Sequence, residues 1–260
     1  MYKDDHINVT SPRRRRLMGL HTLFALLQPR ALRLSLRACP VCGPSIVLRL
    51  GAGEVAVRCL RCMATPVHLA LVAAVKASLP HLQRQSAYEL SSAGPVLAYL
   101  RGQFDTVACS EYFKDVPSGA MVNGIRCEDV QKLSFQDASF DLCTSTEVFE
   151  HVPDDMAGFR ELFRVLRPGG RLIFTVPLTG AESTTERAAM VEGGLAYFMA
   201  PTYHGDRLTG NNTVLVFRDY GADICVRLMA AGFRHAAIVE PSTHYFGCSR
   251  SVVMAIKSFV

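Results

Sequence analysis

Short apolar runs alternate with polar turns and with segments of helical periodicity from residue 86 to the carboxyl end of the chain. Runs of apolar and β-branched residues between turns predict buried strands, and apolar residues at every third or fourth position predict helices. This alternation is typical of an α/β fold built on a largely parallel sheet. The pattern predicts seven strands, at residues 87–90, 106–109, 121–126, 142–145, 171–176, 235–240 and 252–257, and helices that include residues 95–100 and 219–231.

Two further segments flank or interrupt this alternation. Residues 66–82 carry apolar residues at helical spacing and reach Pro80, which predicts a helix that ends there and packs on the main domain. Residues 178–213 contain two glycine-bearing turns and predict a loop-rich insertion. In a doubly wound sheet such an insertion would lie over the carboxyl ends of the strands, where ligands bind.

Two Cys-x-x-Cys pairs precede this domain, and 16 residues separate them. Each pair lets two thiolates hold one ion from a tight turn, and the two pairs complete a tetrahedral sulfur cage. With short strands predicted at residues 46–50 and 55–58, the pattern predicts a zinc ribbon over residues 38–64 that depends on its ion for stability. The alternatives are unrelated cysteine pairs or a redox disulfide, although a redox motif needs only one pair. The predicted ligands are Cys39, Cys42, Cys59 and Cys62.

Composition changes this picture mainly at the amino end. The 260 residues are 49% hydrophobic and 20% charged, which is ordinary for a globular protein with one large core. The first 37 residues carry eight Lys or Arg and two Asp, so they account for the net charge of +5. We expect a basic, disordered tail over residues 1–37, followed by the ribbon and by a main domain over residues 65–260.

The composition also bears on where in the cell the protein is located. No apolar run reaches the roughly 18 to 20 residues that span a bilayer, so we expect no membrane span. Five cysteines outside the two pairs are scattered among apolar residues and indicate free thiols in a reducing compartment, which favours the cytoplasm. Residues 13–37 are rich in Arg and Leu and contain no acid, as in a mitochondrial transit peptide, so a mitochondrial location is the alternative.

The most informative motif runs from Phe140 to Phe174. It contains the phrases Glu150-His151-Val152 and Leu166-Arg167-Pro168-Gly169-Gly170, and its pattern predicts a strand, a helix and a second strand. The stretch resembles the second half of a class I S-adenosylmethionine-dependent methyltransferase of the type 11 group. That resemblance implies a Rossmann-like, seven-stranded doubly wound sheet in the order 3-2-1-4-5-7-6, with the last strand antiparallel.

The resemblance also implies a cofactor site at the ends of the first three strands. Glu89 matches the acid that helps hold the methionine ammonium, and it precedes a loop whose small residues let the backbone approach the ligand. Glu111 matches the acid that accepts the ribose hydroxyls, and Asp129 matches the acid that accepts the adenine amino group. The implied cofactor-binding residues are Glu89, Ser91, Ala93, Gly94, Glu111, Tyr112, Asp129, Val130, Ser145, Thr146 and Glu147.

A nicotinamide-binding Rossmann domain is the natural rival. It needs Gly-x-Gly-x-x-Gly after the first strand to hold a pyrophosphate. The chain has Ser-Ser-Ala-Gly-Pro at residues 91–95 instead. S-adenosylmethionine has no phosphate groups, and it can therefore bind a loop with fewer glycines.

Two histidines are candidates for catalysis. His151 follows the fourth strand, where the methyl group should emerge, and it either acts on the acceptor or caps the loop. His204 lies beside Tyr203 in a Tyr-His-Gly-Asp phrase of the insertion, which either supplies a base or shapes a turn. The candidate catalytic residues are therefore His151, His204 and Tyr203.

These observations predict methyl transfer from S-adenosylmethionine to an oxygen or nitrogen of a small-molecule acceptor. One alternative is an RNA methyltransferase that binds nucleic acid through the ribbon or the basic tail, since a zinc site precedes this fold in some rRNA methyltransferases. A second alternative is a non-catalytic, methyltransferase-like scaffold. The retained acids Glu89, Glu111 and Asp129 favour an enzyme.

Overall fold

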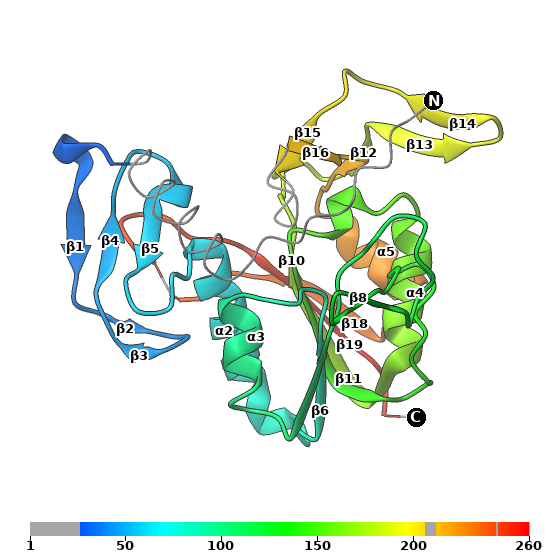
Figure 1. Ribbon diagram of the computed structural model, residues 1–260, viewed down its shortest axis with the longest axis horizontal. Helices are drawn as coiled ribbons and strands as arrows, with labels where there is room; N and C mark the ends of the chain where they lie inside the picture. Colours follow the sequence, from blue (N-terminus) through cyan, green and yellow to red (C-terminus); the bar gives the residue numbers. More distant parts are fainter. Residues whose placement is uncertain (1–26, 206–211, 243, 260) are drawn as a thin grey trace.

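The computed structural model describes residues 27–205, 212–242 and 244–259. Its largest sheet has six strands in the order β18-β19-β11-β10-β6-β7 (Figure 1). Strands β7, β6, β10 and β11 run parallel, and β19 is antiparallel to both β11 and β18. The strands are β6 (Ser86–Glu89), β7 (Thr106–Cys109), β10 (Phe140–Thr146), β11 (Leu166–Thr175), β18 (His235–Val239) and β19 (Val252–Ile256).

Helices cover both faces of this sheet because its central strands are apolar on both sides. Leu142 lies in one core with residues of α2 (Pro66–Ser78) and α3 (Pro95–Leu100). Its neighbour Cys143 lies in the other core with residues of α4 (Asp155–Val165) and α5 (Ile224–Ala230). Successive side chains of a strand point to opposite faces, so α2, with α3, and α4, with α5, form the two outer layers. The predicted packing of the lead-in helix on the main domain is confirmed.

The predicted third strand is wrong. Residues 121–126 form a separate hairpin of β8 (Met121–Val122) and β9 (Ile125–Arg126), outside the six-stranded sheet. The turn consists of Asn123 and Gly124, with φ of 50° and 79°. An Asn-Gly pair adopts left-handed φ values at low cost and closes a two-residue hairpin. Only an isolated parallel bridge between Glu111 and Cys127 lies where the third strand would pair with the second.

The remaining sheet order agrees with the predicted one once that strand is removed. The largest shifts of predicted boundaries are at β11, which begins at Leu166 and takes in the Pro-Gly-Gly phrase as a shift in register, and at α5, which begins at Ile224. The later start of α5 has a reason: Asp219 lies in the β17 ladder and Tyr220 forms a bridge with Leu178, so neither residue is helical. None of the helices in the described parts of the chain is long and apolar enough to cross a bilayer.

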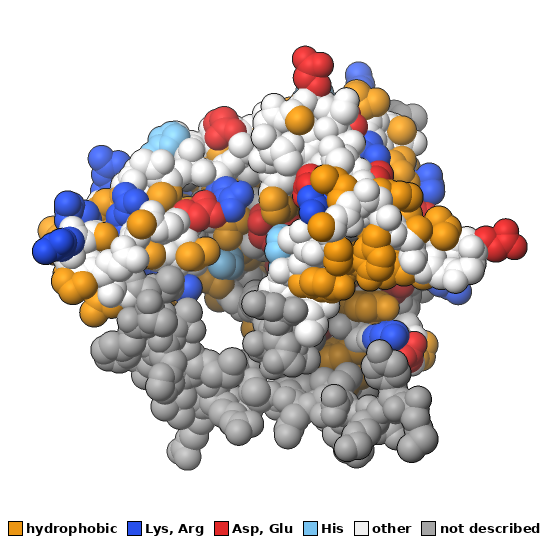
Figure 2. All heavy atoms as spheres, turned by 90° about the horizontal axis from the view of Figure 1, so that it is seen from above, with side chains coloured by type: hydrophobic (Ala, Val, Ile, Leu, Met, Phe, Trp, Pro, Cys, Tyr) orange, Lys and Arg blue, Asp and Glu red, His pale blue; other side chains and the backbone are white. Residues whose placement is uncertain are grey.

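The insertion predicted as loop-rich contains short antiparallel ladders above the sheet (Figure 1). Apolar side chains, among them Met190, Phe198 and Met199, are exposed on and beside its β13–β14 hairpin, and apolar atoms gather on this face in Figure 2. The pairs are β12 (Thr185–Glu186) with β17 (Arg218–Asp219), β13 (Ala188–Val191) with β14 (Gly194–Tyr197), and β15 (Tyr203–Gly205) with β16 (Asn212–Leu215).

The cysteine-rich region forms a small three-stranded sheet in the order β1-β4-β5 beside a β2–β3 hairpin. Its first strand lies within residues 1–37, so the ordered module includes part of the segment predicted as a tail. Residues 1–26 of that tail, with most of the transit-like stretch, lie outside the described residues. The strands are β1 (Arg33–Ser35), β2 (Ala38–Cys39), β3 (Gly43–Pro44), β4 (Val47–Arg49) and β5 (Val57–Cys59), and short 3-10 turns are η1 (Pro29–Ala31), η2 (Glu54–Ala56), η3 (Leu79–His81) and η4 (Phe149–His151).

The ribbon packs on the segment between β18 and β19. Tyr245 is buried in the ribbon's apolar cluster, and its hydroxyl donates to the Ala38 carbonyl at 2.7 Å. Arg250 forms an ion pair with Glu54 of η2. The ribbon is thereby attached to the main domain next to the carboxyl ends of the central strands.

Candidate functional site

The carboxyl end of β6 holds a buried acid in front of a glycine turn. Glu89 is 2% exposed and accepts a short hydrogen bond from the Thr144 hydroxyl of β10. Gly94 has φ of 128° and caps α3, whose first residue is Pro95. Only glycine adopts that φ readily, and proline suits the first helical position. The loop therefore keeps its glycine where the backbone needs it.

Glu111 follows β7 and faces the same loop. Its Oε1 accepts hydrogen bonds from the Ser92 amide and the Ser92 hydroxyl, both at 2.8 Å. No hydrogen bond from the described residues reaches its Oε2. One oxygen thus fixes the loop, and the other remains available as an acceptor for a ligand hydroxyl.

The residues predicted to contact adenine are Tyr112, Asp129 and Val130. Asp129 accepts from the Gln131 amide at 2.9 Å and from the Gln131 side chain at 3.0 Å. Tyr112 is 60% exposed, whereas Val130 is buried in the main core. The Glu111–Cys127 bridge brings this segment beside the end of β7, but the assigned contacts to adenine remain predictions.

The carboxyl end of β10 concentrates buried polar atoms that have no hydrogen-bond partner among the described residues. They include Ser145 Oγ, Thr146 Oγ1 and Glu147 Oε1 on consecutive residues, and both carboxylate oxygens of Glu150. Glu147 also has a left-handed backbone, with φ of 52°. Burying a polar group without a partner costs roughly 1–3 kcal/mol, so such a concentration indicates a place where a ligand supplies the partners.

Two histidines converge on Glu150, and we call Glu150, His151 and His204 the Glu-His-His cluster. His151 Nε2 lies 3.5 Å from Glu150 Oε1 and 3.2 Å from His204 Nδ1. His204 Nδ1 lies 3.9 Å from the same carboxylate oxygen. Exposure increases across the cluster: Glu150 is buried, whereas the side chain of His204 is 42% exposed. The cluster therefore opens toward solvent.

Burial dominates the electrostatics of the cluster. It raises the pKa of Glu150 to about 8, with the nearby charge of Glu147 adding to the effect. It also raises the pKa of Glu147. Burial lowers the pKa of His151, and His204 lowers it further, while the Leu215 carbonyl opposes the shift. These directions favour neutral side chains unless a cationic partner is present.

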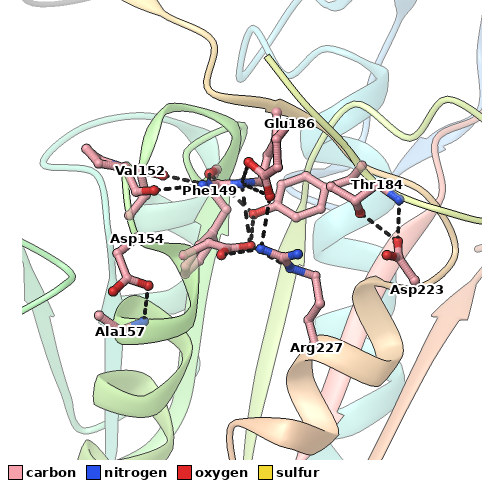
Figure 3. Close-up of polar contacts among 12 residues, drawn as sticks. Phe149, Val152, Asp154, Ala157, Thr184, Glu186, Asp223 and Arg227 are labelled. Carbon is pink, nitrogen blue, oxygen red and sulfur yellow. Dashed lines mark hydrogen bonds and ion pairs between the residues drawn. The ribbon is translucent and has the colours of Figure 1, made fainter. Parts of the chain in front are cut away.

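A network of buried charges holds the turn that carries the cluster (Figure 3). Phe149 anchors η4 by stacking on Phe159 at 4.5 Å between ring centroids. Arg218, 3% exposed, donates to the Val152 carbonyl at 2.5 Å and to the Pro153 carbonyl at 2.7 Å. The insertion thus satisfies the carbonyls of this turn and fixes the direction of Glu150 and His151.

The four predicted metal ligands come together. Cys39 and Cys62 sulfurs lie 3.7 Å apart, and Cys42 and Cys59 sulfurs lie 3.6 Å apart. All four lie within 4.8 Å of one another. Zinc bonds of about 2.3 Å in a tetrahedron place sulfur atoms about 3.8 Å apart, so the cluster is consistent with a zinc-binding module.

Two functional features were absent from the sequence-based site. Glu150 was part of the quoted motif but was not assigned a role, and an acid between apolar neighbours such as Phe149 and Val152 was the available signal. Arg218 gave no local signal, because the carbonyls to which it donates lie more than sixty residues away along the chain. Of the predicted catalytic residues, the structure brings His151 and His204 together, and Tyr203 is 46% exposed beside them on β15.

Comparisons with known proteins match parts of the chain to methyltransferases. A family model described as a methyltransferase domain matches residues 118–174. An uncharacterized methyltransferase of Mycobacterium sp. (strain KMS) is 34% identical over 97 residues, which cover 35% of this chain and 34% of that protein. The 27-O-demethylrifamycin SV methyltransferase of Amycolatopsis mediterranei (strain S699) is 40% identical over 72 residues, 26% of each protein.

The chain thus spans about a third of the length of the first curated relatives that it matches. Among solved structures, an S-adenosylmethionine-dependent methyltransferase from Mesorhizobium loti aligns with a TM-score of 0.46 and 18% identity, over 71% of this chain and 96% of that one. The family match covers β10, α4 and most of β11, which carry the motif and half of the site. Residues 118–174 therefore match a methyltransferase domain, and the chain carries an amino-terminal four-cysteine cluster consistent with zinc binding.

Proposed function

We propose that the protein transfers the methyl group of S-adenosylmethionine to an oxygen or nitrogen of a small molecule. The observation that carries the proposal is the set of unpartnered buried polar atoms at the carboxyl end of β10, next to Glu89 and Glu111. Ligands of doubly wound sheets bind at this end. The family match lies on the same elements.

The residues present fit the cofactor. Glu89 supplies a buried carboxylate for the methionine ammonium, and Glu111 Oε2 can accept from a ribose hydroxyl. Ser91, Ala93 and Gly94 form the loop beside the methionine part, while Tyr112, Asp129 and Val130 form the adenine end. When bound, the cofactor supplies an electrophilic methyl group, and the protein's task is to position the acceptor and exclude water.

The Glu-His-His cluster would hold the acceptor. His151 Nδ1 donates to the Leu215 carbonyl at 2.8 Å, which leaves the lone pair of Nε2 facing the cluster. That nitrogen can accept a proton from an acceptor hydroxyl or amine. His204 and Tyr203, both partly exposed, lie at the entrance and would orient the acceptor rather than take its proton.

A small molecule suits the surroundings better than RNA. Two of the ribbon's cations are engaged within the protein: Arg49 donates to three backbone carbonyls, and Arg61 donates to the Cys42 carbonyl. Burial lowers the pKa of Arg58. Phosphate binding needs available cations, whereas the exposed apolar side chains of the insertion suit an acceptor with an apolar body.

Calorimetry with S-adenosylhomocysteine tests the proposal. We expect the parent protein to bind it and the Glu111→Ala variant to bind it tenfold to a hundredfold more weakly, since a charge-assisted hydrogen bond is worth about 1.5–3 kcal/mol. Asp105→Ala, an exposed acid at the amino end of β7, is the matched control and should keep parent affinity. Absence of binding to the parent favours the scaffold alternative, and parent affinity in Glu111→Ala would remove the ribose assignment.

A further inference from the structure

The Glu-His-His cluster has the dimensions of a metal site. Its three potential ligand atoms, Glu150 Oε1, His151 Nε2 and His204 Nδ1, are separated by 3.2, 3.5 and 3.9 Å. Tetrahedral bonds of about 2.0–2.1 Å to nitrogen and oxygen place neighbouring ligand atoms about 3.3 Å apart. A single ion can therefore contact all three groups with small movements of the exposed His204.

His151 has the orientation that a metal-binding histidine needs. Its Nδ1 donates to the Leu215 carbonyl of β16 at 2.8 Å, so its Nε2 carries a lone pair directed at the other two groups. Metal-binding histidines usually donate their second ring N–H to such a carbonyl or to a carboxylate. The same β15–β16 hairpin carries His204 and accepts the hydrogen bond from His151. One hairpin therefore fixes the orientation of both imidazole rings.

Charge at the cluster also favours a cation. Glu150 is 1% exposed, and neither of its oxygens has a hydrogen-bond partner among the described residues. Glu147, also with a buried unpartnered oxygen, lies close enough to affect it. The nearby cation, Arg250, is paired with Glu54 of the ribbon. A buried carboxylate without a partner is costly, and a bound ion would remove that cost.

We propose that Glu150, His151 and His204 bind one divalent transition-metal ion, at a site separate from the four-cysteine cluster. Two imidazoles and one carboxylate suit zinc, cobalt or ferrous iron, and they do not suit magnesium, which prefers oxygen ligands. Three protein ligands leave at least one position for an acceptor oxygen, whose proton the ion would acidify. With the ion bound, His151 Nε2 is a metal ligand, so the ion replaces His151 as the group that promotes loss of the proton. That role rests on the proposed function, whereas ion binding itself does not.

Cobalt titration of the full-length protein, purified with zinc in its ribbon, tests the site. We expect one equivalent of Co²⁺ to bind with visible d–d absorption and without a thiolate-to-cobalt charge-transfer band, because no cysteine contributes. Mg²⁺ should not compete. Glu150→Gln and His204→Ala should each weaken Co²⁺ binding by about tenfold or more. His204 is partly exposed, so its variant should fold, and circular dichroism verifies both.

His235→Ala is the matched control, because His235 is exposed at the amino end of β18, and it should titrate like the parent. Three results would overturn the proposal: no Co²⁺ uptake by the parent beyond the ribbon, parent affinity in both cluster variants, or equal competition by Mg²⁺. S-adenosylhomocysteine calorimetry on the same preparations separates the two proposals. Cofactor binding without ion uptake removes only the metal site, and ion uptake without cofactor binding removes only the proposed function.

Discussion

Two groups of polar side chains lie at the η4 turn, and they differ in how they are satisfied. In the first group, Asp155 accepts from Arg227 and from the Tyr220 hydroxyl, and Glu186 pairs with both Arg218 and Arg227 (Figure 3). In the second group, Glu147 and Glu150 hold buried oxygens without partners among the described residues.

We interpret the paired group as structural and the unpaired group as functional. The paired network completes itself within the protein and fixes the turn, as buried charges must. The unpaired group lowers the stability of the ligand-free protein. Proteins retain such groups at sites where a bound ligand supplies the missing hydrogen-bond partners. The four-cysteine cluster belongs with the unpaired group, because its thiols contact one another and a bound ion would complete their interactions.

The largest expected effect comes from breaking the cysteine cluster. Cys59→Ser should abolish stoichiometric zinc at the ribbon and with it most of an apparent binding free energy on the order of 10–16 kcal/mol. Hydrogen exchange should show loss of protection in β4 and β5 while β10 and β11 stay protected. Cys109→Ser, outside the cluster, should retain zinc. Zinc retained at full stoichiometry by Cys59→Ser would contradict the ligand assignment.

Breaking the paired network should cost less but still be severe. Arg218→Ala leaves Asp155 and Glu186 with one cation fewer and removes the donor to the carbonyls of the turn. Loss of one partner from a buried pair typically costs about 3–5 kcal/mol, to be measured by urea unfolding. Arg160→Ala, on the exposed side of α4, should change stability by less than about 0.5 kcal/mol. A similarly small change in Arg218→Ala would show that the network does not hold η4.

The unpaired group should respond in the opposite way. Glu150→Leu removes a buried carboxyl that has no hydrogen-bond partner among the described residues, so the free energy of unfolding should stay the same or rise by about 1–3 kcal/mol. The measurement uses protein with zinc in the ribbon and no other added metal. A loss comparable to that of Arg218→Ala would mean that Glu150 has a structural partner, and the contrast between the two regions would fail.

Much of the fold was predictable because its signals are local. The predicted helix begins with proline at residue 95, as α3 does, and residues 106–109 form the predicted strand. The third strand was predicted wrongly although Asn123-Gly124 is a hairpin signal, because the apolar run around it suggested continuity. The ladders of residues 178–213 escaped prediction since their short strands have no clear period of two.

The cofactor-binding acids were easier to predict from the sequence than the contact between the two histidines. Glu89 lies at the end of the first predicted strand and Glu111 follows the second, so strand ends alone predicted that they lie near each other. The pairing of His151 with His204 depends on the β15–β16 hairpin, whose docking on η4 is a tertiary contact between residues far apart in the chain. The same is true of Arg218, whose position follows from folding and not from any spacing in the sequence.

A crystal structure grown with S-adenosylhomocysteine tests the central claim most directly, namely that the unpaired group is a ligand site. We expect the ligand at the carboxyl ends of β6, β7 and β10, with a ribose hydroxyl on Glu111 Oε2 and the sulfur directed toward Glu150 and His151. Ser145, Thr146 and Glu147 should then gain partners from the ligand or from ordered water. A ligand bound elsewhere, or a complex in which these atoms stay buried and unpartnered, would contradict the account.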